Sequence, residues 1–293
     1  MNKQIYIVKA TGEREEFDPA KLKASHLRAK AGSEIAENIT AKIEGELKEG
    51  MTTAQIYHNA FGLLAEAERG VAARYSLRKA ILDLGPTGFP FEQFVAEIFR
   101  AKGFETTTEF IARGQCAEHE IDVTAWNENK LIFIESKFHN EHGTKSDLKT
   151  ALYVKARWDD LADREFDLSR LDSISQSTIG QRKLHKVKKM DEGWLITNTK
   201  FSSSAIEYAK CRNMKLVGWN YPEVGNLQDL VEETRLHPIT CLTSINPHDE
   251  KLLMEAGIVL CKQAKENPDI MAQIGLGKEK IDRMMEEINL IQK

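Results

Sequence analysis

The spacing of apolar and polar residues over the first 84 residues predicts a small hairpin followed by helices. Alternation within residues 4–17 indicates two short strands joined by a turn. Asp18 and Pro19 supply an N-cap and a first-turn proline for a helix. Two further helical patterns follow, one opened by Thr52-Thr53 and the other covering residues 71–84. The segment is therefore predicted to be a hairpin on a small helical bundle.

A glycine- and proline-rich stretch, GPTGFP at residues 85–90, interrupts regular structure and is the best domain boundary in the chain. Beyond it, FEQFVAEIFRAKG has apolar residues at helical spacing and ends at Gly103, which predicts a helix with a glycine C-cap. Strands are expected at residues 104–111, 120–126 and 131–137, a long helix at about 145–162, and later strands in GWLITNT and MKLVGWN. This order of elements indicates one layered α/β domain with a mixed sheet.

A helical pattern returns beyond Pro238 in LLMEAGIVLCKQAKE and IGLGKEKIDRMMEEI, which predicts a small all-α domain. The length of 293 residues agrees with two or three domains of roughly 100 to 200 residues each. We therefore expect a multidomain protein whose domains cover residues 1–86, 87–236 and 237–293.

Composition adds limits on location and partners. The four cysteines show no zinc-ligand spacing, and the chain has neither an apolar signal core at its start nor a run of about 18 apolar residues. We therefore expect reduced thiols, a cytoplasmic location and no membrane partner. The net charge of −4 gives no general attraction to nucleic acid, so DNA must be bound by local basic surface. The densest basic stretch, GQRKLHKVKKM, contains Lys183 and Lys186 and is either a DNA contact or a solvated helix face.

Candidate chemistry is concentrated in two of the predicted strands. Asp122 lies in EIDV, and Glu135 and Lys137 close LIFIESK thirteen residues later. Alternate residues of a strand point to the same side, so Glu135 and Lys137 share a face, and Asp122 lies beside them if the strands pair as a hairpin. We expect Ile132 and Ile134 on that face as well, deeper in the sheet, and Phe133 on the other.

Two acids and a lysine in this arrangement suit phosphodiester hydrolysis. The reaction needs a hard cation held by carboxylate oxygens, which polarises the phosphate and lowers the pKa of an attacking water. Asp122 and Glu135 would hold Mg²⁺ or Mn²⁺, and Lys137 would orient the nucleophile or offset charge on the phosphate. The alternative is a surface hairpin with an ordinary Glu-Lys pair, but the helix before it, the aspartate strand and the apolar lead-in favour the functional interpretation.

Residues 88–220 resemble the Mrr-type branch of the PD-(D/E)xK restriction-endonuclease-like superfamily. The resemblance is carried by GFPFEQFVAEIFRAKGF, EIDVTAW and LIFIESKFH, in that order. It implies a metal-binding Asp122 and Glu135, a catalytic Lys137 and a supporting Glu92 on the first helix; for Glu92 the alternative is a polar position beside a buried helix stripe. The residues before the aspartate usually include a glycine in this family, whereas this chain has CAEHEIDV there. The resemblance therefore gives His119 and Glu120 no role.

Residues 3–84 resemble an ATP-cone, the nucleotide-sensing module at the start of many ribonucleotide reductases. The match rests on IYIVKATGEREEFDPAKL, MTTAQIY and AARYSLRKAIL, with Ala10 where the family often has a second basic residue. The resemblance implies that ATP or dATP binds as an effector and that the protein is a homo-oligomer whose size responds to it. The implied phosphate contacts are Lys9 and Lys21, and the implied base and ribose contacts are Glu15, Asp18 and Thr53. The chain has no Gly-x-x-x-x-Gly-Lys-Ser/Thr loop, so an ATP-driven motor is not expected.

The segment IGLGKEKI resembles the Gly-hydrophobic-Gly turn of a helix-hairpin-helix element, whose backbone amides bind DNA phosphate. Gly275, Gly277 and Lys278 would make that contact. A plain turn between helices is the alternative.

These features together predict a Mg²⁺-dependent DNA endonuclease regulated by ATP or dATP. Two alternatives remain: a nucleotide-responsive DNA-binding regulator with an inactive nuclease fold, and a structure-selective DNA resolvase. The intact Glu135-Ser136-Lys137 favours an active enzyme, because an inactive descendant has no chemical reason to keep this set.

Overall fold

The computed structural model describes residues 4–9, 12–141, 143–168, 171 and 187–292. By their internal contacts, residues 1–80 and 237–293 form one compact unit, called here the first unit, and residues 81–236 form another, the second unit. Most of the first expected domain range and all of the third thus lie within one compact unit, whereas residues 81–86 belong to the second. Each unit is described by itself.

The first unit begins with a hairpin on helices. Strands β1 (Tyr6–Val8) and β2 (Arg14–Glu16) pair antiparallel, as the alternation predicted. The Asp18 side chain accepts hydrogen bonds from the N–H groups of Ala20 and Lys21 and caps the first helix, and Thr52 and Gln55 form a capping box on the third. The helices are α1 (Pro19–Arg28), α2 (Ser33–Glu46), α3 (Thr53–Ala67), α4 (Arg69–Tyr75) and α5 (Leu77–Leu82).

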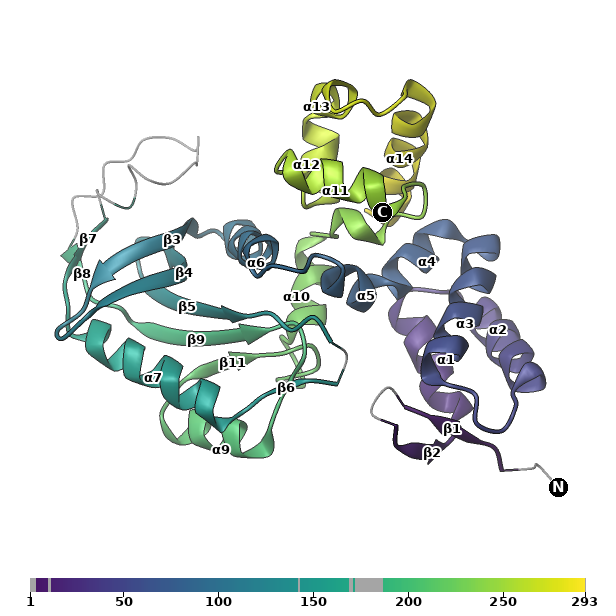
Figure 1. The fold of residues 1–293 in the computed structure, drawn as a ribbon, viewed down its shortest axis with the longest axis horizontal. Helices are drawn as coiled ribbons and strands as arrows, with labels where there is room; N and C mark the ends of the chain where they lie inside the picture. Colours follow the sequence, from purple (N-terminus) through teal and green to yellow (C-terminus); the bar gives the residue numbers. More distant parts are fainter. Residues whose placement is uncertain (1–3, 10–11, 142, 169–170, 172–186, 293) are drawn as a thin grey trace. The chain divides into compact units, whose positions relative to one another are not determined.

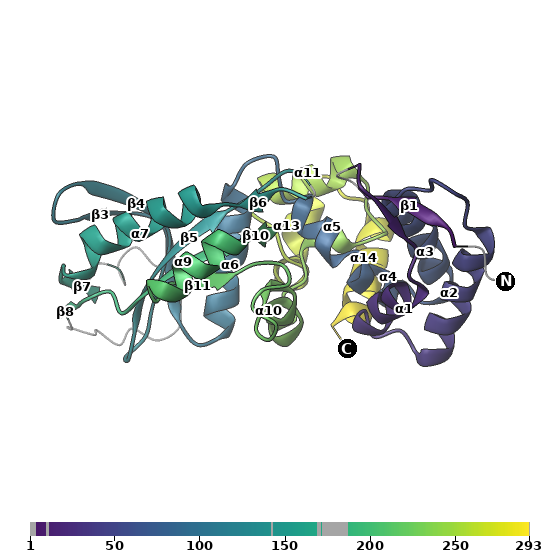
Figure 2. The same ribbon diagram turned by 90° about the horizontal axis from the view of Figure 1, so that it is seen from below.

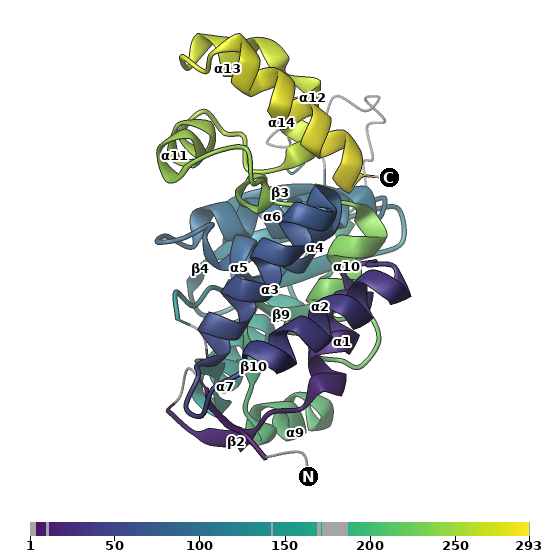
Figure 3. The same ribbon diagram turned by 90° about the vertical axis from the view of Figure 1, so that its right-hand side faces the viewer.

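The rest of the first unit is helical and packs on the first helices. The bounds are η1 (Ile239–Cys241), α11 (Pro247–Glu255), α12 (Cys261–Glu266), α13 (Pro268–Gln273) and α14 (Lys278–Ile291). Helix α14 packs against α4 (Figure 3), where a Cβ atom at Gly70 would lie 3.2 Å from the carbonyl oxygen of Leu290. Ala73 and Ala80 belong to the same apolar core as Met284 and Ile288. A close crossing of α4 and α14 thus packs the C-terminal helices against the N-terminal helices.

The second unit is built on a mixed five-stranded sheet in the order β11-β9-β5-β4-β3. The strands are β3 (Glu105–Arg113), β4 (Glu118–Trp126), β5 (Leu131–Lys137), β9 (Glu192–Thr197) and β11 (Lys215–Val217). Strand β4 pairs antiparallel with both β3 and β5, whereas β9 pairs parallel with both β5 and β11. The multidomain fold class expected from the sequence is confirmed.

Helices cover both faces of this sheet (Figures 1 and 2). Helix α6 (Phe89–Ala101) packs on β3 and β4, while α7 (Leu148–Ala162) and α9 (Ser203–Cys211) lie on the opposite face. Helix α10 (Leu227–Thr234) contacts α6. Two short pairs complete the unit: β6 (Lys145–Ser146) with β10 (Lys200–Phe201), and β7 (Phe166–Asp167) with β8 (Val187–Lys188).

Two details of this unit differ from the sequence prediction. The long helix begins at Leu148 and not near residue 145, because Asp147 caps it and residues 145–146 pair with β10. The expected faces of β5 are wrong for its apolar residues: Phe133 shares the face of Glu135, since both contact Arg157 of α7. The physical reason is the two-residue period of a strand, which places residues 133 and 135 on one side and residues 132 and 134 on the other.

None of the helices in the described part of the chain has the length and apolar character that crossing a membrane requires.

Candidate nuclease centre

Strands β4 and β5 bring two carboxylates of the candidate site together, Asp122 from the middle of β4 and Glu135 from near the end of β5. The strands pair antiparallel as far as Val123↔Ile134, and Asp122 and Glu135 are the next residues on either strand. Asp122 Oδ2 accepts a hydrogen bond from the backbone N–H of Ser136 at 2.7 Å. The aspartate side chain therefore bridges the two strands at the point where their regular pairing stops.

The neighbouring strand β3 is irregular at the same level. Thr108 and Phe110 each pair with a residue of β4, but Glu109 between them has a φ of 54°. A left-handed backbone costs a residue other than glycine roughly 1–2 kcal/mol. Asp122 therefore lies beside a strained position, and strain of this kind clusters at functional sites.

Arg157 of α7 reaches into the site from the helical layer. Its guanidinium forms an ion pair with the Glu135 carboxylate and donates a hydrogen bond to the carbonyl oxygen of Glu120. The guanidinium carbon also lies 5.7 Å from the centre of the Phe133 ring and 5.4 Å from that of Tyr153. With only 8% of Arg157 exposed, this cation is held rigidly beside Glu135.

Burial raises the pKa values of three acids here, and repulsion from neighbouring carboxylates adds to the shift for Glu92 and Glu135. Burial and then the Asp122 charge raise the pKa of Glu135 to about 7, although Arg157 opposes the shift. Burial followed by the charges of Asp122, Glu109 and Glu120 raises the pKa of Glu92 to about 7. Burial also raises the pKa of Asp122, against the hydrogen bond from Ser136.

These shifts identify a local excess of negative charge. The charge of Asp122 acts on both Glu92 and Glu135, so the three carboxylates lie within electrostatic reach of one another. The buried cation beside them, Arg157, is paired with Glu135. A ligand of high positive charge would relieve the repulsion.

Lys137 is the last residue of strand β5, two residues beyond Glu135, and it is exposed. Its positive charge lowers the pKa of Asp122, which places it on the edge of the same cluster. Within the described ranges, Lys137 has no ion pair or side-chain hydrogen bond. Its ammonium group is therefore available for a ligand.

A cavity of about 260 Å³ lies beside Asp122. His119 Nε2 lies 2.7 Å from Asp160 Oδ2, and the Asp160 carboxylate also accepts the backbone N–H groups of Cys116 and Ala117. The hydrogen bond from His119 holds the pKa of Asp160 well below its usual range. Helix α7 thus fixes the start of β4 through Asp160 as well as Arg157. The cavity is lined by Glu118, His119, Glu120, Asp122, Tyr153 and Arg157.

The residues present fit a hard divalent cation. The available donors are carboxylate oxygens, which Mg²⁺ prefers, and burial raises the pKa values of both acids, so a bound cation would favour their ionised forms. No three His, Cys, Asp or Glu side chains in the described part of the chain converge as a complete ligand set. Mg²⁺ characteristically uses one or two carboxylates and completes its shell with waters and substrate phosphates, so Asp122 and Glu135 suffice.

In the first unit, the structure also brings together most of the residues implied for nucleotide binding. Lys9 Nζ lies 2.6 Å from Glu15 Oε2, and the charges of Lys21 and Asp18 both act on Glu15. The hydrogen bond to Lys9 lowers the pKa of Glu15, and the same pairing raises that of Lys9. Thr53 begins α3 directly after Thr52, which bridges to Val8 of the hairpin.

Comparison with known proteins matches three segments of the chain to known domain families. An ATP cone domain matches residues 5–83, a restriction endonuclease domain of the Mrr catalytic type matches residues 86–220, and the AF1548-like C-terminal domain matches residues 237–292. An uncharacterized protein of Archaeoglobus fulgidus is 34% identical over 194 residues, which are 66% of this chain and 97% of that protein. The chain belongs to the AF1548-like family. A crystal structure of AF1548, described as a protein of unknown function, covers 70% of this chain and 98% of its own, with 31% identity and a TM-score of 0.53.

The AF1548-like C-terminal domain contains the turn that resembles a helix-hairpin-helix. Gly275 has a φ of 89°, Gly277 is the N-cap of α14, and Lys278 is its first residue. Lys183 and Lys186, the other expected DNA contacts, lie outside the described residues.

Sequence reasoning missed Arg157 and Asp160 in this AF1548-like protein. A signal for Arg157 was present: it lies three residues after Val154 and four before Leu161, both buried, so a charge interrupts the apolar stripe of α7. A charged residue on such a stripe needs a buried partner. Its partner, Glu135, is distant in sequence, and only the fold shows the pairing.

Proposed function

We propose that this protein is a divalent-metal-dependent DNA endonuclease that is regulated by ATP or dATP bound to its cone. The observation that carries the proposal is the pairing of β4 and β5, which places Asp122 and Glu135 together near Lys137, with the pKa values of both acids raised by burial. The Mrr-type match over this domain makes DNA the substrate to expect.

Each residue would have a distinct part in the reaction. Asp122 and Glu135 would hold Mg²⁺ or Mn²⁺, which when bound polarises the phosphate and lowers the pKa of water. The Lys137 ammonium would orient the attacking water and offset charge on the phosphate oxygens. Glu92, whose pKa is about 7, could accept a proton at neutral pH. Arg157 would fix the Glu135 carboxylate through their ion pair.

Regulation would come from the cone, through the phosphate contacts Lys9 and Lys21. Both lysines lie near Glu15, so a triphosphate would have to replace Glu15 as the partner of Lys9. A coupling of about 1–3 kcal/mol is typical of allostery and changes activity roughly 5- to 150-fold.

The test is cleavage of plasmid DNA with Mg²⁺, with and without ATP, by wild type and Lys137→Ala. We expect the variant to cut about 100-fold more slowly or worse, as is usual when a group that stabilises developing charge is removed. Lys215→Ala is the matched control, because Lys215 is an exposed lysine at the start of another strand of the same sheet. Equal cutting by wild type and Lys137→Ala would refute the site. DNA binding without cutting by wild type would support the regulator instead.

A further inference from the structure

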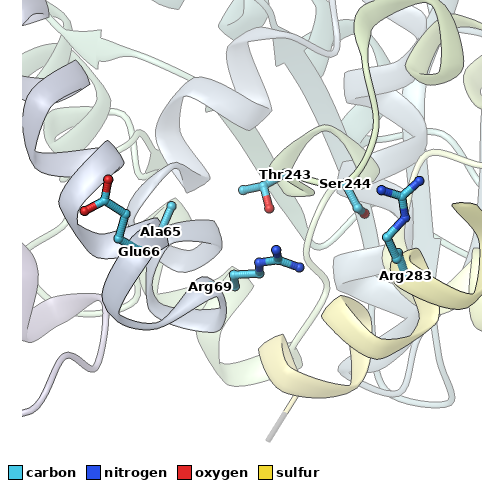
Figure 4. Close-up of a pocket in the computed structure, with 6 residues that line it drawn as sticks. All are labelled: Ala65, Glu66, Arg69, Thr243, Ser244 and Arg283. Carbon is cyan, nitrogen blue, oxygen red and sulfur yellow. The ribbon is translucent and has the colours of Figure 1, made fainter.

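The first unit contains a second cavity, of about 550 Å³, that is separate from the implied nucleotide contacts. Arg69 at the start of α4 and Arg283 of α14 line it together with Thr243 and Ser244, which follow η1 (Figure 4). Ala65 and Glu66 at the end of α3 complete the lining. The cavity therefore takes its walls from both the ATP-cone region and the AF1548-like C-terminal domain.

Two arginines line this cavity, and neither has a carboxylate partner among the described residues. In Figure 4 the guanidinium groups of Arg69 and Arg283 extend toward Thr243 and Ser244, whereas the Glu66 carboxylate points away from them. Among the described residues, Arg69 has no ion pair or side-chain hydrogen bond, and Arg283 donates only to the carbonyl oxygen of Glu279, at 3.3 Å. Two unpaired cations facing one space favour an anionic ligand there.

The loop between these arginines is held in place by a buried carboxylate. Glu287 is 2% exposed and accepts the backbone N–H groups of Thr243 and Ser244 at 2.6 and 2.9 Å, and the Thr243 hydroxyl at 2.8 Å. The Ser244 hydroxyl oxygen is shielded from solvent and has no hydrogen-bond partner in the described ranges. The loop thus carries a hydroxyl donor that no protein group in the described ranges uses.

This cavity is distant from the residues implied for ATP. Thr53 begins α3 and Ala65 lies near its end. Twelve residues of α-helix span about 18 Å, so one ligand cannot contact the phosphate lysines and both arginines through a single phosphate group.

We propose that this cavity is a phosphate site at which a ligand bridges the ATP-cone region and the C-terminal domain. Guanidinium groups bind phosphate oxygens in pairs of parallel hydrogen bonds, and two of them on separate helices would contact one phosphate group from two sides. The volume lies within the range of small-ligand sites. The phosphate can belong to a free nucleotide or to the DNA backbone, since both present the same oxygens. The proposal does not depend on nuclease activity.

The test is isothermal titration of the full-length protein with inorganic tripolyphosphate, ATP and a short DNA duplex, in the absence of divalent metal. We compare wild type with Arg69→Gln/Arg283→Gln, with Lys9→Gln/Lys21→Gln, and with Lys42→Gln, an exposed lysine of α2 that serves as the control. We expect the double arginine variant to lose one phosphate site, with affinity at least 10-fold weaker, while the lysine variant keeps it.

The three titrated ligands distinguish a free nucleotide from the DNA backbone as the source of the phosphate. A loss confined to the duplex assigns the site to the DNA backbone, and a loss for tripolyphosphate and ATP assigns it to a free nucleotide. Arg69→Lys/Arg283→Lys is expected to restore part of the affinity, and unchanged thermal unfolding shows that the variants fold. Binding of all three ligands that is unaffected by the arginine substitutions, or absent in wild type, overturns the proposal.

Discussion

The candidate nuclease centre and the candidate nucleotide site of the cone differ in how their charges are balanced. In the second unit, Asp122, Glu135 and Glu92 are largely buried near one another, and burial is the main cause that raises the pKa values of all three. In the first unit, Lys9 and Glu15 neutralise each other near the surface. Their pairing raises the pKa of Lys9 and lowers the pKa of Glu15, so both residues stay charged. The first arrangement requires a ligand to relieve it, whereas the second is complete without one.

This difference predicts different consequences of mutation. A site with uncompensated buried charge should gain stability when a charge is removed and should lose its chemistry at the same time. A self-paired surface site should lose ligand affinity with little change in stability.

The largest expected effect is on catalysis by Asp122→Asn. Removing the charge takes away a ligand oxygen of the proposed metal site, so DNA cleavage should fall about 100- to 1,000-fold. The amide oxygen can still accept the Ser136 N–H, so we expect the thermal midpoint without metal to rise or stay equal, and the pKa of Glu135 to fall. Asp163→Asn, at an exposed position after α7, is the control. A clear loss of stability in Asp122→Asn would show that repulsion does not dominate the site.

Arg157→Gln should have the largest effect on folding. The substitution leaves Glu135 without its cation and the Glu120 carbonyl without its donor, in a place where only 10% of the arginine side chain and 15% of the glutamate are exposed. Breaking one half of a buried pair costs about 3 kcal/mol, which urea unfolding would measure. Arg212→Gln, which removes an exposed arginine 3.9 Å from Asp159, should change stability far less. Equal effects of the two substitutions would mean that the Arg157 pair contributes no more than a surface contact.

The raised pKa values predict how stability depends on pH. Glu92 and Glu135 have ordinary pKa values of 4.5 that rise to about 7 in the folded protein, so the folded state binds protons more tightly than the unfolded state. Their contribution to stability is therefore full below pH 4.5 and is lost as pH rises toward 7. Without metal, we expect the free energy of unfolding to fall across this window by on the order of 3 kcal/mol.

Mg²⁺ should reverse this loss, because ionised carboxylates bind it best. The increase in thermal midpoint caused by Mg²⁺ is expected to be larger at pH 8 than at pH 5, and Glu92→Gln should flatten the pH dependence measured without metal. Glu165→Gln, at an exposed position, is the control. A stability that rises between pH 5 and pH 7 in the same buffer would contradict the charge excess.

The sequence was most informative where neighbours in space are neighbours in the chain. Asp122 and Glu135 are joined by one hairpin, so alternation and a turn signal suffice to bring them together. Arg157 comes from a helix 22 residues after Glu135, and its direction depends on how α7 packs on the sheet. The packing of Gly70 against Leu290 depends on shape at a helix crossing, which no local pattern records. The left-handed backbone of Glu109 could not be predicted either, because glutamate does not favour this conformation.

The smallest expected effect on folding is that of Lys9→Gln in the cone. Lys9 and its partner Glu15 are each about one-third exposed, so the thermal midpoint should stay within about a degree of wild type. ATP and dATP should nevertheless bind roughly 10-fold more weakly, since one charge-assisted hydrogen bond to phosphate is lost. We also expect ATP or dATP to change the oligomeric state of wild type in light scattering, and the variant to need more nucleotide for the same change. Lys42→Gln, at an exposed position of α2, should behave as wild type. If neither nucleotide alters the size of wild type, the cone does not act through assembly, and if Lys9→Gln binds both nucleotides normally, the pairing with Glu15 is a structural contact alone.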